Sequence, residues 1–156
     1  MRIRRFEMND AEQVSKLVGR NFIEINSKDY AIEEMKKMAL LFSPEKIKER
    51  AQNGHMYVVC EGELIVGTGT ISDFWGSKTE NILLTIFVLP EYHGKGIGRK
   101  IIHTLENDEM TIGTKRIEVC ASITACKFYE KCGYSYKNGT KKLDNEGHYR
   151  MEKFIR

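Results

Sequence analysis

Apolar and polar residues change their spacing several times along this chain. Residues 2–6 alternate between the two classes, which predicts a first strand. The next segment, to about residue 25, carries apolar side chains every three or four positions, and Asn9 or Asp10 is placed to cap this helix. The apolar stripe of this helix comprises Ala11, Val14, Leu17, Val18 and Phe22.

Two further helices and a hairpin are predicted before the middle of the chain. Residues 30–42 have helical spacing, and residues 43–54 start a short third helix with Ser43 as its cap. Residues 55–74 form two β-rich runs around the tight turn at 61–63, which predicts an antiparallel hairpin.

The second half of the chain alternates strands and helices. Residues 81–90 are nearly all apolar up to Pro90, which predicts a central strand covered on both faces. The remaining expected elements are a helix at 98–110, a strand at 116–122, a short helix at 124–132 stopped by Gly133, and two final strands within 134–155. This order predicts an α/β or α+β fold with a mixed central sheet flanked by helices.

Composition narrows the class of protein. A length of 156 residues with 41% hydrophobic and 30% charged residues predicts one globular domain over residues 1–156. The formal charge of +3 comes from scattered lysines and arginines, so no nucleic-acid-binding surface is expected. No apolar run is long enough to span a membrane, and the charged N-terminus does not resemble a signal peptide. Four separated cysteines are then expected to be reduced thiols in a cytoplasmic protein.

The segment VLPEYHGKGIGRK, residues 88–100, carries the most specific chemistry. Glycines at the start of a helix let backbone N–H groups approach a ligand, and the helix dipole favours an anion there. The spacing predicts a phosphate or pyrophosphate site. It lacks the Ser or Thr of a Walker loop, and its GxGxG spacing at mid-chain does not match a dinucleotide fingerprint.

Two motifs in this chain resemble those of the GCN5-related N-acetyltransferases. HGKGIG fits the family's coenzyme A pyrophosphate loop except at its first position, and SITACKFYEKCGY at 122–134 resembles the family's second motif about 30 residues later. The departures are His93 in place of Gln or Arg and Ser122 in place of Asn. The loop match is carried by Val88, Pro90, Glu91, Tyr92, Gly94, Gly96, Ile97 and Gly98. The predicted order of strands and helices fits the same family along the whole chain.

The resemblance implies a GNAT-type fold and a set of site residues. It places the backbone amides of Phe87 and Val88 at a strand bulge, against the pantetheine arm and thioester of acetyl-CoA. Tyr129 would be the general acid near the sulfur. The usual glutamate two residues before the bulge is replaced by Thr85, so the general base stays unassigned. The other coenzyme-binding residues implied are His93, Gly94, Lys95, Gly96, Ile97, Gly98, Arg99 and Ser122.

The function expected from the resemblance is transfer of an acetyl group from acetyl-CoA to a primary amine, by direct attack within a ternary complex. The alternative is a non-catalytic acyl-CoA-binding or regulatory domain, which the missing glutamate keeps open. On spacing alone the glycines can be turn residues and Tyr129 a core residue. The expected partners are acetyl-CoA and a small-molecule or peptide amine, with no nucleic acid, membrane or metal and with a homodimer left open.

Ligand-dependent melting separates coenzyme A from nucleotides as the ligand of the glycine segment. CoA or acetyl-CoA at 100 times its dissociation constant adds about 2.7 kcal/mol to stability, so the melting temperature rises visibly. NAD or ATP at the same concentration leaves the melting temperature unchanged. A larger shift with either nucleotide contradicts the family resemblance.

Overall fold

The computed structural model describes residues 1–155, which form one seven-stranded sheet in the order β1-β2-β3-β4-β5-β7-β6. All neighbouring strands are antiparallel except β4 and β5, which are parallel. The strands are β1 (Arg2–Arg5), β2 (His55–Glu61), β3 (Leu64–Asp73), β4 (Glu80–Val88), β5 (Arg116–Ala121), β6 (Ser135–Tyr136) and β7 (Tyr149–Phe154). The predicted mixed sheet flanked by helices is confirmed.

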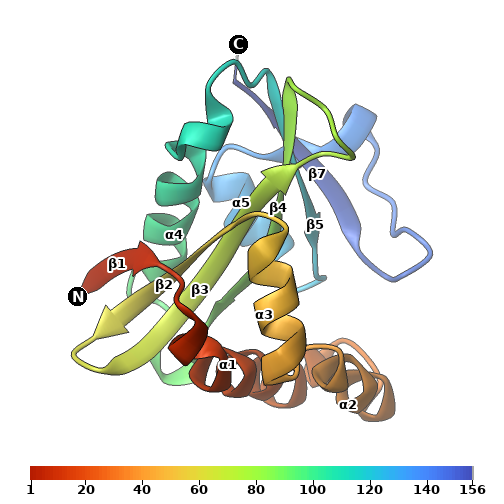
Figure 1. Ribbon diagram of the computed structural model, residues 1–156. Coiled ribbons are helices and arrows are strands. Elements are labelled where there is room, and N and C mark those ends of the chain that lie inside the picture. The colour runs from red at the N-terminus through yellow and green to blue at the C-terminus, as the bar shows by residue number, and fades with distance from the viewer. Residues whose placement is uncertain (156) are drawn as a thin grey trace.

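Helices lie on both faces of this sheet (Figure 1). Helices α1 and α3 pack on one face, against β2, β3 and β4, and α4 packs on the other face, with α5 beside it. The α-helices are α1 (Ala11–Glu24), α2 (Ile32–Leu40), α3 (Pro44–Gln52), α4 (Ile97–Glu106) and α5 (Cys126–Lys131). The 3₁₀ helices are η1 (Met8–Asp10), η2 (Asn26–Lys28), η3 (Pro90–Tyr92), η4 (Glu109–Thr111) and η5 (Lys137–Gly139). No helix among the described residues combines the length and apolarity needed to cross a bilayer.

Most predicted elements are present, and the caps show where local and tertiary contacts compete. Ser43 caps α3 as predicted, since its hydroxyl accepts the Lys46 N–H at 3.3 Å. Asp10 precedes α1 but does not cap it with its side chain. Its carboxylate instead accepts the Glu7 N–H at 2.8 Å and pairs with the Arg4 guanidinium at 2.8 Å, so it ties η1 to β1.

Helices contact β4 on both faces as predicted, but the second half of the strand, from Leu84 to Val88, is less buried than the first. Strands β4 and β5 pair from Glu80↔Arg116 to Leu83↔Val119, and beyond that point the described strands are no longer paired. Leu84 is 39% exposed. The predicted closing pair of strands is also shorter than expected: β6 has two residues, and η5 and a loop at residues 140–148 separate it from β7.

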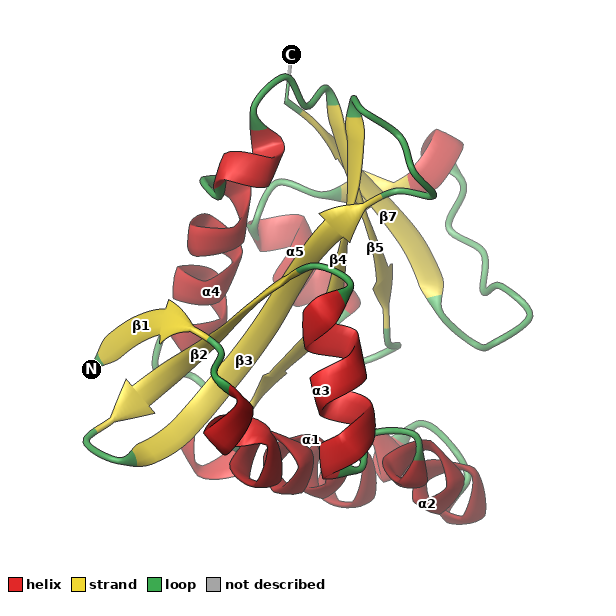
Figure 2. Ribbon diagram, viewed as in Figure 1, coloured by secondary structure: helices red, strands yellow, loops and turns green. Residues whose placement is uncertain are grey.

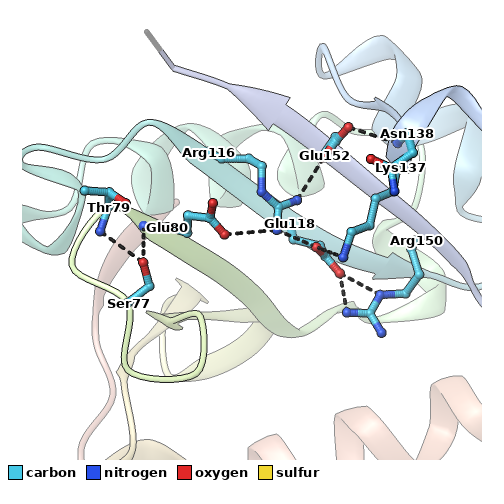
Figure 3. Close-up of polar contacts among 9 residues, drawn as sticks. All are labelled: Ser77, Thr79, Glu80, Arg116, Glu118, Lys137, Asn138, Arg150 and Glu152. Atoms are coloured by element: carbon cyan, nitrogen blue, oxygen red, sulfur yellow. Dashed lines mark hydrogen bonds and ion pairs between the residues drawn. The ribbon is translucent and has the colours of Figure 1, made fainter.

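A network of charged side chains joins β5 and β7 on a face of the sheet that no described α-helix covers (Figure 2). Glu118 lies at its centre with no exposed side-chain surface. Its carboxylate accepts hydrogen bonds from Arg116 at 2.7 Å and Arg150 at 2.6 Å, and pairs with Lys137 at 2.9 Å (Figure 3). Arg116 also bonds Glu152 at 2.9 Å, so it separates two glutamates that lie opposite each other across the strands.

The protonation of Glu118 links this network to pH. Burial alone would raise the pKa of Glu118, but the hydrogen bonds from Lys137, Arg116 and Arg150 outweigh burial and lower it. The resulting stabilisation is therefore complete above the pKa of a glutamate in the unfolded chain, about 4.3, and is lost as the pH falls below that value.

Replacing Glu118 tests the network. Glu118→Gln keeps the shape of the side chain but leaves three cations without their central anion, so the free energy of unfolding should fall by about 3–5 kcal/mol at pH 7. The difference from the wild type should narrow as the pH falls through 4. Urea unfolding at several pH values measures both. Glu33→Gln, in an exposed pair with Lys36, is the matched control and should change stability by less than about 0.5 kcal/mol.

Candidate functional site

A bulge in β4 turns the strand away from β5. Thr70 pairs with Leu84 and Thr68 pairs with Phe87, so Thr85 and Ile86 together oppose the single residue Gly69. Thr85 has φ +52°, a left-handed conformation that a β-branched residue rarely adopts. Thr85 therefore lies inside the bulge, not two residues before it as the resemblance implied.

The parting of β4 and β5 leaves a cavity of about 120 Å³. This is the volume of about four water molecules. Its walls come from β4, β5, α5, the α1–η2 segment and the turn before β7. The lining residues are Phe22, Asn26, Leu83, Leu84, Ile86, Phe87, Val119, Cys120, Ser122, Ala125, Tyr129 and His148.

Phe87 and Val88 present different groups to this opening. The Leu89 N–H donates to the Val66 carbonyl on β3, and backbone groups alternate direction along an antiparallel strand. The peptide groups of Phe87 therefore face β3, and those of Val88 face the side from which β5 has departed. Only the Val88 amide is directed as the resemblance implied, because β3 takes the backbone of Phe87, and Phe87 contributes its ring to the cavity wall.

The glycine segment forms a turn that exposes backbone at the start of α4. Gly94 and Gly96 have φ +76° and +80°, and a Cβ at either residue would meet no atom within 4 Å. Gly96 is the N-cap of α4, so the N–H groups of Ile97, Gly98 and Arg99 have no carbonyl within the helix to bind. The Ile97 side chain is buried in the core, so Ile97 offers this turn its backbone alone.

Gly98 has a different role from its neighbours. A Cβ at Gly98 would lie 2.9 Å from the Phe128 ring, so the absence of a side chain lets α4 and α5 pack closely. A side chain introduced at Gly98 would displace Phe128, so its effect on ligand binding could not be separated from its effect on packing. Gly96 is therefore the informative position for testing ligand binding.

The charged side chains of the turn divide between structure and solvent. The His93 ring donates from Nε2 to the Val88 carbonyl at 2.8 Å. The residue that departs from the family motif therefore forms a hydrogen bond with the last residue of β4. Lys95 and Arg99 are exposed beside the turn. They provide positive charge beside the free N–H groups at the start of α4.

Tyr129 and Ser122 lie on the cavity wall opposite β4. Tyr129 is 6% exposed, and no described residue hydrogen bonds to its hydroxyl. Burial raises the pKa of Tyr129, so the hydroxyl keeps its proton at neutral pH. Ser122 directly follows β5, and its carbonyl accepts the Ala125 N–H in the turn that leads into α5.

Three residues of the site were not found by motif. Asn21 is buried on the apolar stripe of α1, and its amide donates to the carbonyls of Leu17 at 3.0 Å and Val88 at 2.9 Å. A polar residue on an apolar stripe is a sequence signal that could have identified it. Tyr30 and His148 meet only in the tertiary structure, and nothing in the local sequence predicts their contact.

These features match a known family of enzymes. A family model described as an acetyltransferase (GNAT) domain matches residues 52–136, a segment that includes the β4 bulge, the glycine turn and Tyr129. The chain belongs to this GNAT family. The resemblance drawn from the two motifs is thereby confirmed. Among curated proteins, none matches the chain.

Solved structures share the whole fold at low sequence identity. The PaiA N-acetyltransferase from Thermoplasma acidophilum, in complex with coenzyme A, has a TM-score of 0.84 at 18% identity over 99% of this chain and 98% of its own. A GCN5-related N-acetyltransferase from Rhodopseudomonas palustris has 0.81 at 20% over 99% and 95%. An aminoglycoside 6′-N-acetyltransferase complexed with coenzyme A has 0.71 at 17% over 100% and 98%. The GNAT fold therefore extends beyond the matched segment to both ends of the chain.

Metal ligands do not gather in this site. Among residues 1–155, no three His, Cys, Asp or Glu side chains lie where they could hold an ion. That the reaction needs no metal stays a prediction from the sequence.

The glycine turn can be tested with a matched pair of variants. Gly96→Glu places a negative side chain at the free N–H groups of α4 and should abolish coenzyme A binding in calorimetric titration. Gly113→Glu is the control, because Gly113 also has a left-handed φ, +82°, and open surroundings. It lies before β5 and not in the glycine turn. Each variant should lose about 1 kcal/mol of stability from backbone strain. Equal coenzyme A affinity in the two variants would remove the turn from the binding site.

Proposed function

We propose that this GNAT protein is an acetyl-CoA-dependent N-acetyltransferase that moves the acetyl group to a primary amine by direct attack in a ternary complex. The observation that carries the proposal is the parting of β4 from β5, which leaves a cavity with Tyr129 on its wall, together with the glycine turn that follows the end of β4. Crystal structures of proteins with this fold hold coenzyme A or acetyl-CoA, which supports the same ligand here.

The residues present fit the two ends of acetyl-CoA. The exposed turn at Gly94 and Gly96, with Lys95 and Arg99 beside it, suits the pyrophosphate, because free N–H groups and cations both favour an anion. The Val88 N–H faces the side of β4 from which β5 has departed, where it suits the carbonyl oxygen of the thioester. Ser122 lies on the facing wall, with a hydroxyl in place of the family's amide.

Direct transfer needs the two substrates to be held together more than it needs a nucleophile on the protein. The amine nitrogen attacks the thioester carbon, a tetrahedral intermediate forms, and its carbon–sulfur bond breaks to release the thiolate. Fixing both reactants in one cavity supplies a large part of the rate by removing their freedom to diffuse and rotate. Cys120 lines the cavity, but no described side chain contacts its thiol as a base would.

Tyr129 suits the departure of the thiolate. Its raised pKa ensures that the hydroxyl carries a proton at neutral pH, and the same shift makes complete proton loss less favourable. The role that fits both is donation of a hydrogen bond to the sulfur as charge develops, with proton transfer completed as the bond breaks.

Coenzyme A release from acetyl-CoA, followed with a thiol reagent, tests the function against polyamines, aminoglycosides, amino acids and peptides. Turnover that requires one of these amines supports the proposal. Binding of acetyl-CoA without turnover of any amine would instead favour the non-catalytic binding domain. The cytoplasmic location expected from the sequence stays a prediction.

Two neighbouring tyrosines allow a controlled test of Tyr129. Tyr129→Phe removes only a hydroxyl without a described partner, so acetyl-CoA should still bind while turnover falls by about 10²–10⁴. Tyr134→Phe is the control, because the Tyr134 hydroxyl is bonded to Glu106 at 2.7 Å outside the cavity. It should cost about 1 kcal/mol of stability and leave turnover unchanged. Equal turnover of wild type and Tyr129→Phe would assign Tyr129 to the core.

A further inference from the structure

The transfer reaction leaves one task without a residue, which is removal of the proton from the amine. An ammonium ion has no lone pair, so the amine must lose a proton before it attacks. Thr85 has no basic group. Glu80, the one acidic residue of β4, lies at the far end of the β4–β5 pairing and is paired with Arg116 at 3.2 Å. Strand β4 therefore supplies no base to the opening.

Three of the side chains that line the cavity can titrate: Cys120, Tyr129 and His148. Thiols and phenols ordinarily keep their protons at neutral pH, whereas imidazole is the side chain that exchanges a proton between pH 5 and 8. His148 comes from the turn before β7, and its wall differs from the α5 wall that carries Tyr129. No described residue hydrogen bonds to its ring.

The turn that carries His148 is held by hydrogen bonds among its own residues. Asp144 Oδ1 accepts the N–H groups of Glu146 and His148, each at 2.9 Å, and the Asp144 N–H donates to the His148 carbonyl at 2.8 Å. Leu143 and Tyr149 form a β-bridge across the base of the turn. Because Asp144 bonds both sides of the turn, His148 has a fixed main-chain position at the cavity.

Tyr30 ties this turn to the wall that carries Tyr129. Its hydroxyl donates to the Gly147 carbonyl at 2.6 Å and accepts the Ile123 N–H at 3.2 Å, between β5 and α5. Gly147 has φ +78°, and a Cβ there would lie 3.0 Å from the Tyr30 ring, so only glycine permits this contact. The Tyr30 and His148 rings lie 6.1 Å apart. One hydroxyl thus fixes the spacing of the two walls.

We propose that His148 is the general base of the acetyl transfer, a role that rests on the proposed N-acetyltransferase function. The neutral imidazole takes one proton from the ammonium group, and the free amine nitrogen then bonds to the thioester carbon. The carbon–sulfur bond breaks, and the thiolate leaves with the proton of Tyr129. The second proton on the attacking nitrogen returns the phenolate of Tyr129 to phenol, and imidazolium passes its proton to water. The sum is one amide, one thiol and one proton.

The Asp144 carboxylate accepts the His148 main-chain N–H. Arg150, the cation next along β7, is held by Glu118. The titratable and charged groups around the Tyr30–His148 pair are Asp29, Tyr30, Cys120, Tyr129, Asp144, Glu146, Tyr149 and Arg150.

The test compares kcat/KM against pH for wild type, His148→Gln and His103→Gln, with an amine found in the panel screen. At pH 7, His148→Gln should lose about 10²–10⁴ of kcat/KM and should lose the lower limb of the pH profile that imidazole titration produces. Acetyl-CoA affinity by calorimetry should not change. With an aromatic amine, which is already unprotonated at pH 7, the loss should shrink to a few-fold. His103 is exposed on α4, and its variant should match the wild type throughout.

The outcomes separate this role from the function on which it rests. If the wild type turns over an amine and His148→Gln keeps its rate and lower pH limb, His148 is not the base while the N-acetyltransferase stands. If no amine is turned over, the function fails and the role of His148 fails with it. His148→Asn repeats the test with a shorter amide side chain. If the loss of kcat/KM with the aromatic amine is as large as the loss with the protonated amine, the ring positions the substrate instead of removing its proton.

Discussion

The separation of β4 from β5 is the constraint on which the site depends. Two parallel strands that pair over four positions would ordinarily continue to do so, and the bulge at Thr85 and Ile86 prevents this. It turns the end of β4 so that the Val88 peptide group has no strand beside it. The Val88 carbonyl instead accepts hydrogen bonds from the side chains of Asn21 and His93.

Keeping such an opening requires that the strands on either side be held independently. On the β3 side, α1 and α4 cover the two faces of the sheet. On the β5 side, one face has no described helix, and the ion network around Glu118 joins β5 to β7 instead. A buried carboxylate with three cations is strongly destabilised when one partner is lost, so this half of the sheet is held by charge where the other half is held by apolar packing.

The secondary structure could be predicted because it depends on local periodicity. The stripe of α1, the hairpin turn at Gly62 and the cap at Ser43 all act within a few residues, and each lies where the sequence indicates. The second half of β4 is less buried than predicted because eight apolar residues describe a buried strand and do not show where its neighbour ends. Asp10 does not cap α1 with its side chain as predicted, because Arg4, on a different element, binds its carboxylate.

The glycine turn and the helix with Tyr129 were visible in the sequence because each is a contiguous motif whose residue types follow from backbone geometry. The facing wall was not, since the hydroxyl of Tyr30 bonds to Ile123 and to Gly147, each more than 90 residues further along the chain. The sequence by itself determined the family, the fold class and the position of the glycine turn. Only the tertiary structure decided which side chains line the cavity wall that faces Tyr129, because those contacts depend on how far β5 moves from β4, and no local pattern encodes that distance.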